Sequence, residues 1–210
     1  MDIASIRKDY SLRSLDINDV DISPITQFKS WFKDALDAEV LEANAMNLST
    51  LSTDGYPNGR IVLLKEVDSG FVFFTNYSSQ KGQEIEANPK ASLTFFWPEL
   101  ERQVRIMGEI EKISSNESDD YFFSRPLGSQ IGAWTSPQSQ EISSRSILDE
   151  NMEKVKERFL TEPIIRPEHW GGYRLNPIRI EFWQGRPSRL HDRICYQKNG
   201  ANWKLSRIAP

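Results

Sequence analysis

The sequence has few of the residues that build disulfide bonds and metal sites. Its 210 residues include one cysteine, Cys195, and two histidines. Neither an internal disulfide nor a C-x-x-C or H-x-x-x-H pair of metal ligands is therefore available, and we expect no metal. A single thiol is typical of proteins kept in a reducing compartment, which predicts a cytoplasmic location. We interpret Cys195 as a buried or edge thiol and not as a nucleophile.

Long apolar runs and a surplus of positive charge are also missing. No stretch approaches the roughly 18 apolar residues of a membrane span, and residues 1–10 lack the apolar segment of a secretory signal. The 30 acidic residues outnumber the 26 basic ones, so the net charge of −4 provides no general attraction for nucleic acid. Glycine-rich phosphate-binding motifs, repeats and linkers are absent. We predict one soluble domain over residues 21–210, preceded by a flexible arm over residues 1–20.

The central part of the chain predicts strands. Between residues 45 and 113, five short runs rich in β-branched and aromatic residues alternate with turn signals such as D-G-Y-P-N-G. Two or three more strands follow near the C-terminus, in I-R-I-E-F-W-Q and in a hairpin around K-N-G-A. Strands joined mostly by turns are typical of an antiparallel sheet or barrel, so the expected fold is mainly β.

Helices are expected around this sheet. The first begins at the N-cap Ser23 and carries an apolar stripe at helical spacing, formed by Ile25, Phe28, Phe32 and Leu36. A short helix ends at Asn88, before a proline. Another begins at Ser114, which has capping-box spacing to Glu117, and is ended by Pro126. The last covers about residues 140–160, with a stripe of Leu148, Met152, Val155 and Phe159.

R-I-V-L-L-K, residues 60–65, places Arg60 and Lys65 at the two ends of an aliphatic run. The plainer interpretation is a core strand with charged ends. The alternative is a phosphate clamp, since arginine offers a planar fork and lysine a mobile point charge. The two side chains face opposite sides of a regular strand, so a clamp requires either a bulge or two different anions.

T-N-Y-S-S-Q-K, residues 75–81, sets Thr75 and Lys81 beside the start of an expected helix. Free N–H groups at a helix N-terminus favour a bound anion. In the simpler interpretation Ser78 or Ser79 is only an N-cap. Both interpretations are compatible with each other.

Y-F-F-S-R-P-L-G-S, residues 121–129, brings Tyr121, Arg125 and Ser129 to a helix end and a glycine turn. Tyr121 and Arg125 are four residues apart and share a face if the helix persists, although Pro126 favours unwinding there. This group is either a second phosphate site or ordinary surface residues.

R-L-H-D-R, residues 189–193, places Arg189, His191 and Arg193 at every second position. On an extended strand these three side chains project from one face, where their charges call for an anionic ligand. Trp183 lies shortly before them and offers a flat apolar wall. The combination indicates a planar, negatively charged, electron-accepting ligand. The alternative is a solvated edge strand on which Asp192 pairs with one of the arginines.

Taken together, these segments resemble the pyridoxine/pyridoxamine 5′-phosphate oxidase family of split-barrel flavoproteins, from about Ile6 to Pro210. The matching motifs are R-I-V-L-L-K, F-F-T-N-Y-S-S-Q-K, E-R-Q-V-R, Y-F-F-S-R-P-x-x-S-Q-I-G-A-W, W-G-G-Y-R, I-E-F-W-Q-G and R-L-H-D-R. The resemblance implies an FMN-binding split β-barrel with peripheral helices. It also implies a homodimer with FMN sites at the subunit interface, each built from both chains.

The resemblance assigns residues to the cofactor, to the substrate and to catalysis. The residues implied for FMN are Arg60, Ile61, Val62, Leu63, Leu64, Lys65, Phe74, Thr75, Gln80, Lys81, Gln103, Gln138, Ser139, Trp183 and Arg193. Those implied for the substrate are Arg7, Lys8, Asp9, Tyr10, Lys65, Tyr121, Arg125, Ser129, Arg189, Leu190 and His191, of which Arg189 and His191 are the catalytic pair. Arg60 then serves the flavin phosphate and Lys65 the substrate phosphate. Two different anions remove the difficulty that the two side chains face opposite sides of a regular strand. Gln80 departs from the family pattern, since many members carry a basic residue there.

The implied reaction oxidises pyridoxine and pyridoxamine 5′-phosphate to pyridoxal 5′-phosphate, with hydride transfer to FMN and dioxygen as the final acceptor. Hydrogen peroxide is the second product, and the role is in vitamin B6 salvage. Two alternatives belong to other classes. One is a split-barrel protein that binds flavin or pyridoxal phosphate without turnover, and the other is a flavin reductase with a nicotinamide donor.

Overall fold

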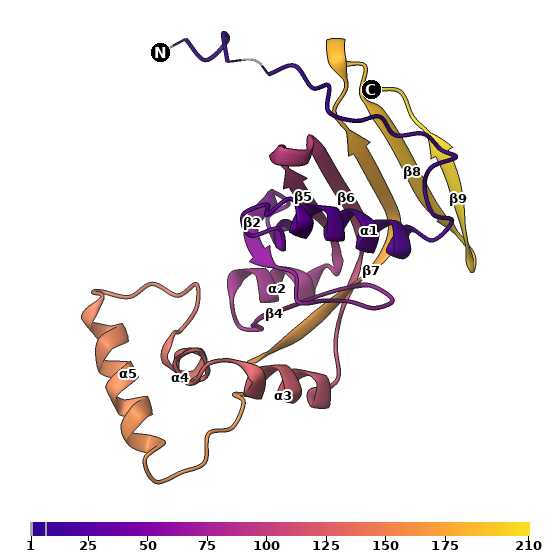
Figure 1. Ribbon diagram of the computed structural model, residues 1–210. Helices are drawn as coiled ribbons and strands as arrows, with labels where there is room; N and C mark the ends of the chain where they lie inside the picture. The colour runs from indigo at the N-terminus through magenta and orange to yellow at the C-terminus, as the bar shows by residue number, and fades with distance from the viewer. Residues whose placement is uncertain (1, 7) are drawn as a thin grey trace.

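The computed structural model describes residues 2–6 and 8–210. Over these residues nine strands form one antiparallel sheet, in the order β2-β1-β5-β6-β7-β4-β3, with β8 beside β7 and β9 beside β8 (Figure 1). The strands are β1 Ala45–Leu51, β2 Pro57–Leu63, β3 Glu66–Val67, β4 Phe71–Asn76, β5 Lys90–Trp97, β6 Arg102–Lys112, β7 Trp170–Gln184, β8 Asp192–Asn199 and β9 Asn202–Arg207. The expected antiparallel β fold is confirmed: the sheet curls into a half-barrel with helices around it.

The 15-residue strand β7 is the spine of the sheet. Along almost its whole length it pairs with β6. On its other side, residues 170–175 pair with β4, and residues 179–184 pair with β8. One continuous strand therefore carries side chains from one end of the sheet to the other.

The helices are α1 Pro24–Asp37, α2 Gln80–Ala87, α3 Ser115–Ser124, α4 Leu127–Thr135 and α5 Ser146–Arg158. Four of them lie near the expected positions, although α5 begins at Ser146 and not near residue 140, and α4 was not expected. The Ser23 cap is confirmed, since its hydroxyl accepts the Thr26 N–H. The capping box is confirmed as well, because the Ser114 hydroxyl accepts the Glu117 N–H at 3.2 Å and the Glu117 carboxylate accepts the Ser114 N–H at 3.0 Å. Over the described residues, none of the helices combines the length and the apolarity needed to cross a membrane.

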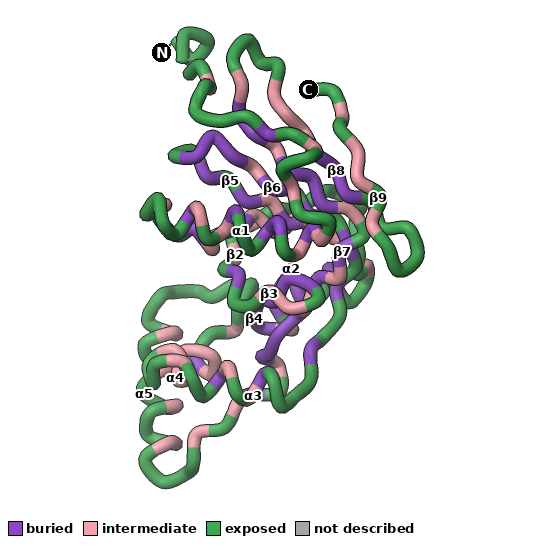
Figure 2. Tube along the Cα trace, turned by 45° about the vertical axis from the view of Figure 1, so that its right-hand side comes forward, coloured by how far each residue is buried: buried purple, intermediate pink, exposed green. Residues whose placement is uncertain are grey.

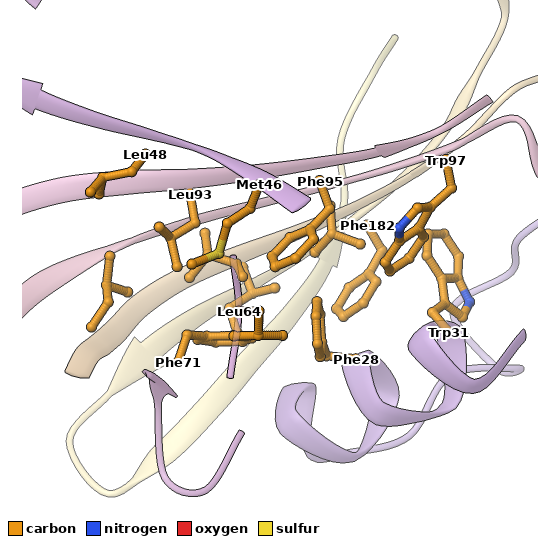
Figure 3. Close-up of a cluster of buried hydrophobic side chains, with 14 of the residues drawn as sticks. Phe28, Trp31, Met46, Leu48, Leu64, Phe71, Leu93, Phe95, Trp97 and Phe182 are labelled. Atoms are coloured by element: carbon orange, nitrogen blue, oxygen red, sulfur yellow. The ribbon is translucent and has the colours of Figure 1, made fainter. Parts of the chain in front are cut away.

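The hydrophobic core lies between α1 and the concave face of the sheet (Figure 3). Phe28 of α1 meets Phe71 and Phe95 with ring centroids 4.9 and 5.0 Å apart, and Trp31 meets Phe182 at 5.1 Å. Burying each such side chain contributes about 1.5–3 kcal/mol. The stripe expected on α1 is therefore partly wrong: Phe28 is buried, but Leu36 is 56% exposed and Trp31 takes the place beside Phe28.

Two segments differ from the sequence expectation. Helix α3 ends at Ser124, before Pro126, as expected, but α4, which the sequence did not predict, follows at once with Pro126 as its N-cap residue. Strand β7 begins at Trp170, well before I-R-I-E-F-W-Q. Its Gly171 and Gly172 hide the strand signal, but a Cβ at either would lie 2.2–2.3 Å from a neighbouring side chain, so close packing requires glycine at both.

The R-L-H-D-R segment is not one extended strand. Residues Pro187–Arg189 form a 3₁₀ turn in which Ser188 and Arg189 have φ of 58° and 60°, and β8 begins only at Asp192. Arg189 and His191 therefore come from a loop and only Arg193 from a strand. The expectation that all three project from one strand face is wrong.

The arm runs across the top of the sheet over β8 and β9 in Figure 1. The backbone N–H of Leu12 donates to the Glu101 carboxylate at 2.9 Å, and that of Leu15 donates to Asp192 at 3.0 Å. Leu15 is buried against the core. At the opposite end of the molecule, α4 and α5 form a lobe that is mostly intermediate or exposed in burial (Figure 2).

Candidate active site

Two separate groups of the expected site residues lie on this fold. The first surrounds a cavity of about 640 Å³ between β2, β4, α3 and α4. We call it the first half-site. Its expected members are Ile61, Val62, Leu63, Lys65, Phe74, Thr75, Lys81, Tyr121, Arg125, Ser129 and Gln138. Residues that the sequence did not indicate also line it, namely Asn76, Pro126, Gly132, Ala133, Ser136 and Trp170.

Aromatic rings form one wall of this cavity. Phe74 and Tyr121 stack with centroids 3.8 Å apart, and Tyr121 lies nearly parallel to Trp170, 6.2 Å away. The side chain of Arg125 extends over Trp170, with its Cζ 4.5 Å from the ring centroid. Such a wall holds Arg125 in place by cation–π contact without using its hydrogen-bond donors.

Arg125 is the strongest sign of an anion-binding site in this cavity. Its Nη1 atom is buried and has no hydrogen-bond partner among the described residues. Burial also lowers the pKa of this guanidinium below its ordinary value. An unsatisfied buried donor costs about 1–3 kcal/mol, more when it is charged. Lys65 adds a second cation nearby, with its Nζ 6.0 Å from the Tyr121 ring.

A second cationic position is built around Lys81. Its ammonium donates to Thr75 Oγ1, Ser79 Oγ and Gln138 Oε1, each at 3.2 Å. Burial, and then the charge of Arg60, lower the pKa of Lys81. Ser79 is also the N-cap of α2, so the N-cap interpretation of this segment is confirmed.

Arg60 lies beside Lys81 but already has protein partners. Its Nη2 pairs with the buried Glu84 carboxylate at 2.8 Å, and its Nη1 donates to Thr50 Oγ1 and to the Leu48 carbonyl. Burial opposes ionisation of Glu84, but hydrogen bonds from Thr50, Asn58 and Arg60 outweigh it and keep its pKa below the ordinary value. Strand β2 ends at Leu63, so Lys65 lies beyond the strand. The alternation of side chains along a regular strand therefore does not decide which way Lys65 faces.

Three other residues expected at the cofactor differ in their surroundings. Leu64 is buried in the hydrophobic core. Gln80 is exposed in the first turn of α2. Ser139 is exposed in a turn with φ of 69°, next to Gln138. The backbones of these residues adjoin the first half-site, while their side chains do not line its cavity.

The remaining expected residues form the second half-site, at the far end of β7. Gln103, Trp183 and Arg193 are directly paired across β6, β7 and β8. Tyr10 of the arm packs edge-on against Trp183 at 5.6 Å, and His191 lies 4.6 Å from the same ring. A cavity of about 300 Å³ opens here, lined by Ile6, Lys8, Asp9, Tyr10, Arg186, Arg189 and His191. Leu190 is exposed beside it, and Arg7 lies outside the described residues.

His191 has a defined tautomer in this loop. Its Nδ1 accepts the backbone N–H of Arg186 at 3.1 Å, which leaves the ring proton on Nε2. Burial, and then the charge of Arg189, lower the pKa of His191. The imidazole is therefore neutral at pH 7 and offers an Nε2–H donor. Asp192 pairs with Arg186 and Arg207, and not with Arg189 or Arg193 as one alternative had it.

One chain cannot bring the two half-sites together. Trp170 lines the first, and Trp183 belongs to the second 13 residues later on β7. At about 3.3 Å per residue the strand separates them by roughly 40 Å. In Figure 1, α3 and α4 lie at one end of β7 and the arm lies at the other.

The curled antiparallel half-barrel gives the protein a split-barrel fold. A solved FMN-binding protein from Nostoc punctiforme, related to pyridoxamine 5′-phosphate oxidase, matches 91% of this chain and 100% of its own with a TM-score of 0.72 at 18% identity. PhzG from Burkholderia lata, solved with tetrahydrophenazine-1-carboxylic acid, matches 95% of this chain and 100% of its own with a TM-score of 0.88 at 31% identity.

Sequence comparison defines the family. Residues 32–159 match the family model described as pyridoxamine 5′-phosphate oxidase, and residues 170–210 match the pyridoxine 5′-phosphate oxidase C-terminal dimerisation region. Curated pyridoxine/pyridoxamine 5′-phosphate oxidases from Cyanothece sp. and Ralstonia pickettii are 54% and 57% identical over 99% of this chain and 98–99% of their own. The chain belongs to the pyridoxine/pyridoxamine 5′-phosphate oxidase family and is an oxidase.

Proposed function

We propose that the protein oxidises pyridoxine 5′-phosphate and pyridoxamine 5′-phosphate to pyridoxal 5′-phosphate, with FMN as bound cofactor and dioxygen as final oxidant. The observation that carries this proposal is the buried Nη1 of Arg125, which has no partner within residues 2–6 and 8–210, in an aromatic cavity that holds a second cationic position at Lys81. Two phosphorylated ligands, one flavin and one pyridine, match these two positions. The residues around Lys81 would hold FMN, which would supply two-electron chemistry: a hydride acceptor for C4′ of the substrate and a donor of electrons to dioxygen, with hydrogen peroxide as the second product.

The residues around Lys81 fit the flavin phosphate. Lys81 supplies the charge, while Thr75 and Gln138 supply polar atoms that already meet its ammonium. Arg60 adds charge from β2, held in place by Glu84. Ile61 and Leu63 are exposed apolar side chains at the same cavity and offer a surface for a flat ring system.

The residues around Arg125 fit the substrate phosphate. Arg125 has an unused buried donor, and Lys65, Tyr121 and Ser129 line the same cavity with charge or hydroxyl groups. Gripping the phosphate fixes the pyridine ring relative to the flavin, and such positioning removes several kcal/mol from a reaction barrier. A substrate without a phosphate loses this anchor.

Arg189 and His191 would act on the reacting end of the substrate. The neutral His191 offers its Nε2–H to the substrate oxygen, and Arg189 places a positive charge beside it. In the alcohol substrate this interaction orients the C4′ hydroxyl, and in the amine it orients the nitrogen. Tyr10 and the arm cover the second half-site and would exclude water from it.

A homodimer would complete each site from two chains. The half-sites lie roughly 40 Å apart along β7, so a two-fold axis must set the first half-site of one copy against the second half-site of the other. Phe96, Met107 and Ile178 are 53%, 45% and 45% exposed on neighbouring strands of the outer sheet face, which gives the interface an apolar centre. The match to a dimerisation region supports this arrangement. We expect the dimer to bury more than about 2,000 Å².

A purified sample tests the proposal directly. The protein is expected to carry a yellow flavin spectrum and, with pyridoxine 5′-phosphate in air, to form peroxide and aldehyde in equal amounts. Unphosphorylated pyridoxine is the control substrate and should react poorly. Bound flavin without turnover would instead indicate a carrier or sensor, and flavin reduction by a nicotinamide donor would indicate a reductase. Either result would contradict the proposed oxidase reaction.

A further inference from the structure

A buried carboxylate lies directly behind Arg193. Glu181 of β7 is 4% exposed, and its Oε1 accepts from Arg193 Nε at 2.9 Å and pairs with Arg193 Nη2 at 2.8 Å. Its other oxygen lies 3.7 Å from Arg105 Nη1. The remaining nitrogen of Arg193, Nη1, donates to the Ala209 carbonyl at 2.9 Å. All three nitrogens of the Arg193 guanidinium are therefore held by the protein.

This arrangement fixes Arg193 beside Trp183. The two residues are directly paired across β7 and β8, and Glu181 precedes Trp183 by two positions, on the same face of the strand. Because both Nε and Nη2 of Arg193 meet the same oxygen of Glu181, the guanidinium has less freedom to turn than a contact through a single nitrogen would leave it. Arg193 can therefore offer a ligand its charge and its planar face, with little freedom to turn.

A buried ion pair is a poor way to stabilise a fold, because well-packed apolar residues of similar volume do as well or better. Glu181 lies on the outer face of the sheet, between two arginines, and outside the hydrophobic core. Its negative charge offsets part of the positive charge that Arg193 and Arg105 present at the second half-site. This offset has its largest effect on the binding of a ligand whose own charge changes during a reaction.

We propose that Glu181 is a positioning residue for the flavin: it holds Arg193 in one orientation and, by offsetting its charge, sets the midpoint potential of the bound cofactor. The inference rests on the proposed function, since it requires that FMN held at the first half-site of one chain also meets the second half-site of its partner. Reduction adds negative charge to the flavin, which nearby cations favour and nearby carboxylates oppose. Glu181 thus keeps the reduced flavin from being held too tightly and eases its reoxidation by dioxygen.

The test compares the FMN-loaded Glu181→Gln protein with the wild-type protein. Glutamine preserves the shape of the side chain and removes its charge. We expect reduced FMN to be held about tenfold more tightly relative to oxidised FMN, which raises the midpoint potential by about 30 mV for a two-electron couple. The control is Glu109→Gln, which makes the same charge change at an exposed position of β6. Its potential should stay at the wild-type value.

A second variant separates orientation from charge. Glu181→Asp keeps the charge and shortens the side chain by one methylene, so its carboxylate no longer reaches both Nε and Nη2 of Arg193. We expect its potential to stay near the wild-type value while oxidised FMN binds about five- to tenfold more weakly, as loss of one net hydrogen bond predicts. This variant also serves if the Gln protein does not fold.

The outcomes are distinct. An unchanged potential in Glu181→Gln, with FMN bound at wild-type stoichiometry, would overturn the charge role and leave the proposed function standing. Wild-type affinity for FMN in Glu181→Asp would overturn the positioning role. A wild-type protein that binds no FMN at all would contradict the proposed function, and this inference with it.

Discussion

Replacing Arg125 by methionine should weaken substrate binding while leaving the fold almost as stable. Methionine fills a similar apolar volume and carries no donor. The change relieves an unsatisfied buried donor, which costs about 1–3 kcal/mol. It also removes the contact of the guanidinium with Trp170 at 4.5 Å, and such a contact contributes about 0.5–2 kcal/mol. The two effects nearly cancel, so the free energy of unfolding should fall by no more than about 1 kcal/mol.

The effect on the substrate is expected to be much larger. A hydrogen bond to a charged group contributes about 1.5–3 kcal/mol. Since about 1.4 kcal/mol corresponds to a factor of ten, the KM for pyridoxine 5′-phosphate should rise roughly 10- to 150-fold. The slow reaction of unphosphorylated pyridoxine should not change, because that substrate has no phosphate for Arg125 to hold.

The assay measures initial rates of peroxide formation for both substrates, together with urea unfolding of the same samples. Arg158→Met is a matched control, since Arg158 also lies over a tryptophan, with its Cζ 4.8 Å from the Trp134 ring, but outside the cavity. The reasoning is refuted if the KM for the phosphorylated substrate changes less than about twofold in Arg125→Met, or rises equally in the control.

Three other changes test the second half-site. Arg189→Ala should retain FMN and lose about 10²-fold in turnover, or roughly 3 kcal/mol of transition-state stabilisation; near-normal kinetics would remove Arg189 from catalysis. Gly185→Ala should displace Tyr10, because the added Cβ would lie 2.7 Å from the tyrosine Cβ. Limited proteolysis should then cut the arm faster, and an unchanged rate of cleavage would contradict the contact between Tyr10 and Gly185. The fold lowers the pKa of His191, so the unfolded chain takes up a proton at a higher pH than the folded chain does. The free energy of unfolding should therefore fall as the pH drops below about 6.5. His191→Asn should weaken that dependence in urea titrations at pH 5.5 and 7.5, and an identical pH dependence in the variant would contradict it.

The sequence predicts the parts of this fold that are controlled by local signals. The capping box at Ser114, the cap at Ser23 and the turn-separated strands between residues 45 and 113 depend on residues that are close in the chain. The structure confirms each of them. Apolar spacing also predicted α5, although the helix begins at Ser146 and not near residue 140, and its predicted stripe is the half-buried side of that helix.

The differences arise where distant residues decide the outcome. Gly171 and Gly172 look like a break in a strand, yet the side chains of Tyr77 and Ile113 pack so closely there that only glycine fits. The alternation in R-L-H-D-R is typical of a strand, but the φ values of Ser188 and Arg189 turn the chain before β8 begins. Neither the packing around the two glycines nor the turn before β8 can be recognised from the residues adjacent in the sequence.

The candidate site shows the same division. Motif resemblance identified most residues of the first half-site, and the structure collects them at one cavity. Trp170 lies in the matching motif W-G-G-Y-R, but no signal in the sequence assigned it to the cavity. Glu181 gave no signal, since its importance lies in a contact with Arg193 across two strands. The separation of the half-sites along β7 also required the three-dimensional structure.

The central claim is that each active site joins the first half-site of one chain to the second half-site of another. Co-expression of Arg125→Met and Arg189→Ala chains tests it most directly, with kcat/KM measured below the KM of the wild-type protein. Each variant alone damages both sites of its dimer. With random pairing, half of the dimers are mixed and one of their two sites is intact, so about one quarter of the wild-type activity should return. Mixed dimers that recover no activity would contradict the shared site.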